Sequence, residues 1–226
     1  AISHRKDIEL LRGGSIVNTG SAEPSQGSFS KITVEGSGTL GGPQRFDVRV
    51  NAADPDRATS TISGDTNAVL NVDTTKFLVF HNVAANIGRI NVLGGMLQIE
   101  QTGGEYNVPH GIHVADGAGL RLYQAVVTTG AVVNVDSGTA QISAQSGTST
   151  MKGPLAVASG ATAELVGTAT VNYEGGVRNA GMVCATGGVH VLKGDIEGTS
   201  YEVAGGEMRL AGAVRESSLT VPVTSG

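Results

Sequence analysis

The residues best suited to metal chemistry are two closely spaced histidines near the middle of the chain. His110 and His113 are the only histidine pair close together in the sequence. A spacing of three places side chains on opposite faces of a strand, so the two could share a metal ion only from a loop. Pro109 and Gly111 favour a loop there. We predict no bound metal or cofactor. His110 and His113 are the candidate ligands if a metal is bound, and the alternative interpretation is that both are polar histidines of a loop.

Paired carboxylates could cleave a glycosidic bond if they lie ~5–9.5 Å apart in a groove. Asp116 and Asp136 are 20 residues apart, and Asp195 and Glu197 are two residues apart on one expected strand. Arg121 is the candidate basic residue beside such a pair. Aromatic residues, which would build a sugar-binding platform, make up only 4% of the chain. We therefore expect the protein not to be an enzyme.

The single cysteine, Cys184, excludes an intrachain disulfide. It lies in the apolar run from Gly181 to Ala185. A nucleophilic cysteine needs a neighbour that favours the thiolate, and the sequence marks none. We therefore predict that Cys184 is a small buried residue with a structural role. The chain also contains no G-x-S-x-G, H-E-x-x-H or Walker motif.

The composition excludes several classes of protein. Charged residues make up 15% of the 226 residues, the net charge is −5, and basic residues are scattered, which argues against a nucleic-acid partner. No apolar run approaches the ~18 residues of a membrane span, so we expect no membrane partner. The charged segment 1–12 lacks the apolar core of a signal peptide, which favours synthesis in the cytoplasm. The 34 glycines show no period of three, which excludes collagen.

A repeat of about 22 residues, each with a glycine followed by a short alternating strand, organises the later part of the chain. The glycines that mark it are spaced by 22, 21, 22, 21 and 24 residues and are Gly95, Gly117, Gly138, Gly160, Gly181 and Gly205. This period suits one coil of a parallel β-solenoid. Small and β-branched side chains would stack inside on the next coil ~4.8 Å away, with glycines at the corners. We predict an all-β protein with this solenoid; an antiparallel β-sandwich or jelly roll is the alternative.

The chain divides by composition into three units: an N-terminal arm over residues 1–30, a β-rich segment over 31–85 and the glycine-rich solenoid body over 86–226. Within the arm, residues 3–12 predict a short helix that Ser3 caps and Gly13 ends. Residues 13–30 predict an extended polar segment. Because apolar side chains are costly to leave in water, we expect those of the arm to dock on a partner: Ile2, Ile8, Leu10, Leu11, Ile16 and Val17.

One segment of the body has a recognisable coil pattern. Residues Gly175 to Val183 read G-x-h-x-N-x-G-x-h, where h is apolar. This resembles the coils of haemagglutinin-type and autotransporter β-helices. The Gly, Ala, Thr and Val content of residues 86–215 also resembles the β-helical parts of bacteriophage spikes, fibres and capsid-decorating proteins. The resemblance to fibres and spikes implies a homotrimer.

The sequence is compatible with three functions. The favoured one is a non-enzymatic structural component of a bacteriophage virion: a capsid decoration or cement protein, or part of a tail fibre or spike. Such a protein would be made in the host cytoplasm and would bind the major capsid or tail protein through its arm. The alternative is an extracellular adhesin or autotransporter passenger at the cell surface, and the third is a polysaccharide-degrading β-helix enzyme. The charged start and polar end suggest a complete chain, which favours the virion role.

Overall fold

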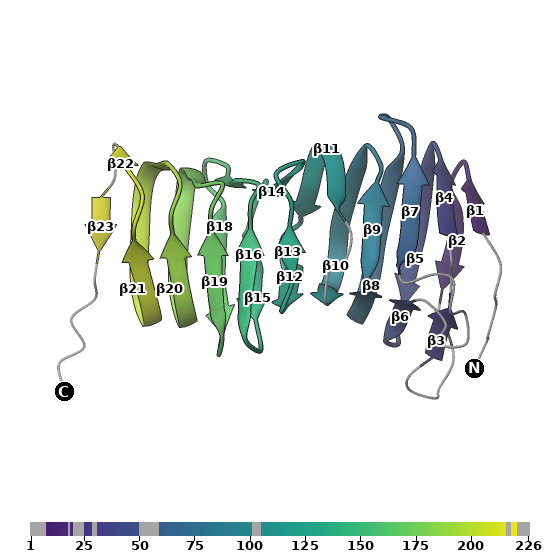
Figure 1. The fold of residues 1–226 in the computed structure, drawn as a ribbon, viewed down its shortest axis with the longest axis horizontal. Coiled ribbons are helices and arrows are strands. Elements are labelled where there is room, and N and C mark those ends of the chain that lie inside the picture. The colour runs from purple at the N-terminus through teal and green to yellow at the C-terminus, as the bar shows by residue number, and fades with distance from the viewer. Residues whose placement is uncertain are drawn as a thin grey trace.

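The computed structural model is a parallel β-solenoid of about eight turns with about 22 residues per coil. It describes residues 8–17, 19, 25–28, 31–49, 59–100, 105–215 and 218–220, and these contain strands but no helix. The coils follow one another along the long axis of the molecule (Figure 1). The solenoid prediction is confirmed, and the antiparallel sandwich is not supported. No helix in the described ranges is long and apolar enough to cross a bilayer.

The described ranges form strands with the following bounds. The first eleven are β1 (Ile8–Leu11), β2 (Gly14–Val17), β3 (Ser25–Ser28), β4 (Lys31–Glu35), β5 (Ser37–Gly42), β6 (Phe46–Arg49), β7 (Ser60–Gly64), β8 (Val69–His81), β9 (Val83–Asn86), β10 (Arg89–Glu100) and β11 (Tyr106–Val114). The next six are β12 (Gly119–Tyr123), β13 (Val126–Val127), β14 (Ala131–Val135), β15 (Thr139–Ala144), β16 (Thr148–Met151) and β17 (Leu155–Val157). The last six are β18 (Thr162–Gly167), β19 (Thr170–Tyr173), β20 (Val177–Leu192), β21 (Ile196–Leu210), β22 (Val214–Arg215) and β23 (Ser218–Thr220).

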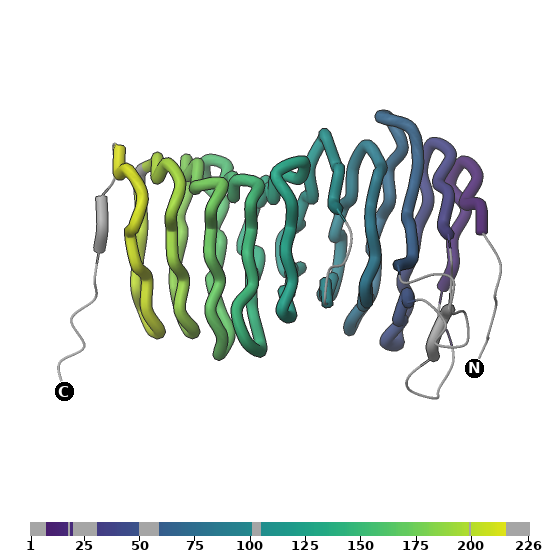
Figure 2. Tube along the Cα trace, in the orientation of Figure 1, coloured from purple at the N-terminus to yellow at the C-terminus, as the bar shows by residue number. Residues whose placement is uncertain are grey.

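Three parallel sheets form the sides of each coil, and the chain visits them in the order A, B, C. Face A contains β1, β4, β7, β9, the start of β11, β13, β16, β19 and the ends of β20 and β21. Face B contains β2, β5, the starts of β8 and β10, the end of β11, β14, β17, the starts of β20 and β21, and β22. Face C contains β3, β6, the ends of β8 and β10, β12, β15, β18, the middles of β20 and β21, and β23. The repeated winding is visible in the trace of Figure 2.

Columns of aliphatic side chains fill the interior of the coils. One column on face B joins seven residues in register, each with no exposed surface: Leu70, Ile90, Ile112, Val133, Leu155, Val177 and Ile196. Burying a side chain of this size stabilises the fold by about 1.5–3 kcal/mol relative to leaving it in water. Each coil therefore rests on its neighbours, and the small interior explains why aromatic residues are scarce.

The glycine period of the sequence marks one corner of the solenoid. Gly95, Gly117, Gly138, Gly160 and Gly181 all lie where the chain turns from face B to face C. Gly95 and Gly138 each have a φ of 60°, a left-handed conformation that side chains disfavour. The sixth glycine of the predicted series, Gly205, lies instead at the corner between faces C and A. Five of the six predicted glycines therefore mark one corner of the coil, and Gly205 marks a different one.

The predicted N-terminal helix is wrong where the structure describes it. Ile8–Leu11 form β1, which pairs with β4, and Gly14–Val17 form β2, which pairs with β5. A single helical turn is stabilised little by its own hydrogen bonds. As a strand, β1 instead forms backbone hydrogen bonds with β4 and buries the side chain of Leu10. The expectation of an arm separate from the β body is also wrong for residues 8–17, because they form part of the first coil. Residues 3–7 lie outside the described ranges.

The strand ladder also runs through both predicted unit boundaries. The pairing of β1 with β4 joins residues on either side of residue 30, and the pairing of β8 with β10 joins residues on either side of residue 85. The described strands thus form one continuous stack.

Candidate functional site

A polar network lies on the outer side of face C, near its N-terminal half. Nδ1 of His81 lies 3.0 Å from Oε2 of Glu100, and Gln98 donates from Nε2 to the other oxygen of the same carboxylate. The side chain of His81 is 41% exposed and that of Glu100 is 19% exposed. The carboxylate therefore orients the imidazole ring at the surface of face C.

Arg121, on β12 of the same face, is a cation without a carboxylate partner among the described residues. Its guanidinium carbon lies 4.7 Å from the centre of the Phe77 ring, and its Nε donates to Oγ of Ser143 at 3.4 Å. No described residue forms an ion pair with it. Loss of solvent around the guanidinium lowers the pKa of Arg121 from its ordinary value. A half-buried, uncompensated guanidinium is a favourable place for an anionic group.

A second polar cluster lies on the outer side of face B. Nδ1 of His113 lies 2.5 Å from Oδ2 of Asp136, and its Nε2 lies 2.7 Å from the backbone oxygen of His110. Nη2 of Arg89 lies 3.9 Å from the same carboxylate oxygen. His110 thus contributes its carbonyl group to this cluster. The residues that the structure describes contain no group of three His, Cys, Asp or Glu side chains arranged to hold a metal ion.

The carboxylates considered for glycoside cleavage have separate environments. Oδ1 of Asp116 accepts a hydrogen bond from the Thr139 backbone at 2.8 Å, so this side chain holds a turn. Asp136 instead binds His113. Asp195 and Glu197 are exposed at the start of β21. Arg121, the proposed basic neighbour, contacts residues of face C rather than either pair.

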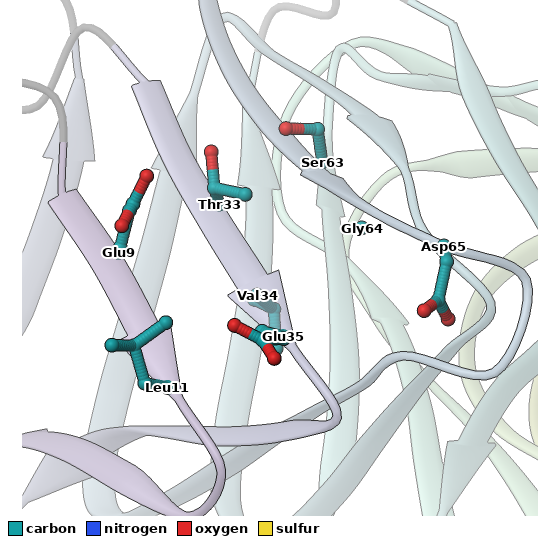
Figure 3. Close-up of a pocket in the computed structure, with 8 residues that line it drawn as sticks. All are labelled: Glu9, Leu11, Thr33, Val34, Glu35, Ser63, Gly64 and Asp65. Atoms are coloured by element: carbon teal, nitrogen blue, oxygen red, sulfur yellow. The ribbon is translucent and has the colours of Figure 1, made fainter.

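The third surface feature is an acidic hollow on the outer side of face A, shown in Figure 3. It has a volume of about 380 Å³. Its lining comes from the first coils: Glu9, Leu11, Thr33, Val34, Glu35, Ser63, Gly64 and Asp65. Glu9, Thr33 and Ser63 are in register on β1, β4 and β7, and Glu35 forms a 3.5 Å ion pair with Arg12. The acidic lining favours cationic groups over anionic ones.

The prediction that Cys184 is buried is wrong. The residue is partly exposed on the outer side of face C, in register between Glu164 and Glu202. Desolvation, followed by the negative charges of Glu202 and then Glu164, raises the pKa of Cys184, and a backbone hydrogen bond at Ala204 opposes part of this. These neighbours disfavour the thiolate, which is the reactive form.

The residues predicted to dock on a partner are divided between the core and the surface. Leu10 is 3% exposed and belongs to the core, and Ile8 and Ile16 pack against it. Leu11 and Val17 are 54% and 47% exposed. Ile2 lies outside the described ranges. Among the described residues of this coil, Leu11 and Val17 therefore offer large apolar surfaces to a partner.

The sequence alone did not predict the pairing of His81 with Glu100 or the contact of Arg121 with Phe77. His81 and Glu100 are 19 residues apart, close to one coil, so the period could have indicated the first pairing. The second contact spans two coils and depends on the register of three strands. No simple spacing would have revealed it.

No protein-family model matches the chain, and neither a curated protein nor a solved structure matches it significantly.

Proposed function

We propose that the protein is a non-enzymatic structural component of a bacteriophage virion, as a capsid decoration or cement protein or as part of a tail fibre or spike. The observation that carries this proposal is the continuous aliphatic column on face B, from Leu70 to Ile196. Such a stack makes a stiff body whose three sides can present surfaces at fixed spacing. The proposal also draws on the resemblance of the coils to those of phage spikes and fibres.

The arrangement of the carboxylates supports a structural role. Asp116 holds a backbone turn and Asp136 binds an imidazole, so each has a local task within the coil. The partners we propose are further copies of the chain and a major capsid or tail protein. The exposed Leu11 and Val17 of the first coil are the docking residues that fit this role.

The test is to examine purified particles of the phage that encodes the chain. We expect mass spectrometry to detect the protein in particles purified by density gradient, and antibody labelling to place it on their surface. A Leu11→Asp/Val17→Asp variant should keep its melting temperature and lose incorporation, whereas Leu93→Asp, at another exposed apolar residue, should be incorporated normally. Absence from the particles, or display on the surface of the producing cell, would contradict the proposal.

A further inference from the structure

Between Phe77 and Glu202, one outer column of face C contains seven residues in register, one from each successive coil, and Glu202 pairs onward with Thr220. In chain order they are Phe77, Met96, Gly119, Gln141, Glu164, Cys184 and Glu202. We call this column the face C ladder. Successive members are ~4.8 Å apart, the spacing of neighbouring strands. Gln141 lies midway between Phe77 and Glu202, three coils from each.

The N-terminal half of the ladder is apolar and carries a positive charge. Phe77 and Met96 are partly exposed, and Arg121 from the adjacent column reaches back so that its guanidinium lies over the Phe77 ring at 4.7 Å. It also donates a hydrogen bond to the hydroxyl of Ser143 and forms no ion pair with a described residue. This half therefore offers an uncompensated cation beside two apolar side chains.

The C-terminal half of the ladder is acidic. The carboxylate of Glu164 accepts hydrogen bonds from two neutral groups, Nε2 of Gln141 at 3.1 Å and the hydroxyl of Thr186 at 3.2 Å. Glu202 is partly exposed and has no hydrogen bond or ion pair with the described part of the chain. Neither carboxylate thus has a cationic partner among the residues with described positions.

We propose that two copies of the chain pair through face C about a two-fold axis at Gln141, so that Arg121 of each copy meets Glu202 of the other. The guanidinium of Arg121 lies over Phe77, three coils before Gln141, and Glu202 lies three coils after it. A half-turn about Gln141 therefore places the two charges opposite each other. The same rotation places Met96 opposite Cys184 of the second copy.

Physical complementarity favours a second copy as the occupant of this face. The N-terminal half of the ladder carries a positive charge and the C-terminal half carries negative charges. Pairing through a two-fold axis therefore brings Arg121 and Glu202 together at two places in one interface. Arginine, phenylalanine and methionine are also the residue types that interface centres favour. A surface that meets itself is isologous and closes as a dimer. The expected assembly is thus a dimer rather than the trimer implied by the resemblance to phage fibres, and it does not depend on a place in a virion.

Sedimentation equilibrium of the full chain at low and high salt tests the charge pairing. We expect the wild type to form dimers whose dissociation constant rises with salt. Arg121→Glu and Glu202→Arg should each weaken association about tenfold or more, and the double variant Arg121→Glu/Glu202→Arg should restore it. Restoration also excludes unfolding as the cause of the losses. Arg209→Glu, on exposed face A, is the matched control and should dimerise like the wild type.

Cross-linking tests the position of the axis. In a Cys184→Ser background, Gln141→Cys should form a disulfide-linked dimer on mild oxidation, because the two copies of residue 141 lie together at the axis. Thr150→Cys on face A should not cross-link. A monomeric or trimeric wild type, a double variant that fails to associate, or equal cross-linking from both positions would overturn the proposal.

Discussion

The hydroxyl of Tyr173 donates a hydrogen bond to Nδ1 of His190 inside the solenoid, with 3.2 Å between the two atoms. The other ring nitrogen, Nε2, lies 2.8 Å from the backbone oxygen of Gly187. A carbonyl only accepts, so Nε2 carries the proton and Nδ1 is the acceptor. His190 is fully buried in this neutral form. Burial lowers the pKa of His190 below its ordinary value, and the bond to Gly187 opposes part of that shift.

The neutral state of His190 predicts that acid weakens the fold. In the unfolded chain the imidazole titrates near 6.5, so as the pH falls below that value the unfolded state binds a proton that the folded state does not yet accept. The free energy of unfolding should therefore decrease from about pH 6.5 down to the lowered pKa, by at most about 1.4 kcal/mol per pH unit for this group. Urea unfolding measured from pH 7.5 to 5 should show that the free energy of unfolding decreases less in His190→Gln than in the wild type. Equal slopes would show that His190 binds protons alike in both states.

Tyr106 offers a contrasting prediction for a buried hydroxyl. Its side chain is fully buried and its hydroxyl has no hydrogen-bond partner in the part of the chain that the structure describes, whereas the hydroxyl of Tyr173 contacts His190. An unsatisfied buried hydroxyl costs about 1–3 kcal/mol. Tyr106→Phe should therefore leave the melting temperature unchanged or raise it, while Tyr173→Phe should lower it. If thermal unfolding shows that both variants lose stability equally, Tyr106 has a partner such as a buried water molecule.

The sequence predicted the solenoid because its corner glycines repeat, but it could not orient every side chain. Cys184 follows Met182 and Val183, and in such an apolar run the alternation between inside and outside cannot be read from hydrophobicity. The inward position of Val183 follows only from the register of β20 with β18. At the N-terminus, the local helix signal over Ile8–Leu11 was overridden by pairing with β4, which is a contact between residues distant in sequence. The contact of Arg121 with Phe77 likewise requires the register of several coils.

Two glycines separate the effect of backbone strain from that of close packing. Gly117 has a φ of 72° with open space where a Cβ would lie, and Gly167 has a φ of 119° with the backbone oxygen of Ala144 only 2.1 Å from that position. Gly117→Ala should cost about 1–2 kcal/mol, as expected for a left-handed alanine. Gly167→Ala should cost clearly more, because the backbone of the neighbouring coil must also move. Chemical denaturation of both variants measures the difference, and equal losses would contradict the close approach.

The environment of Cys184 predicts slow thiol chemistry despite its exposure. Desolvation raises the pKa of Cys184, and the negative charges of Glu202 and Glu164, which flank the thiol, raise it further. At pH 7.5 a thiol reagent should therefore react more slowly with the folded protein than with the unfolded chain. Glu202→Gln should speed the reaction of the folded protein, whereas Glu207→Gln, on face A, should not. If neither variant changes the rate, limited access rather than charge protects the thiol.

The first coil can be tested with two neighbouring leucines that face opposite ways. Leu10 is 3% exposed and packs in the core, while Leu11 is 54% exposed. Leu10→Ala should reduce the free energy of unfolding by about 2 kcal/mol, at the low end of leucine truncations in protein cores because an end coil can relax. Leu11→Ala should leave it nearly unchanged. Deletion of residues 1–17 should also lower the melting temperature, since it removes the strands that cover β4 and β5. A neutral Leu10→Ala and an unchanged melting temperature after the deletion would together mean that residues 8–17 do not stabilise the solenoid, and that their apolar side chains are free to serve a partner.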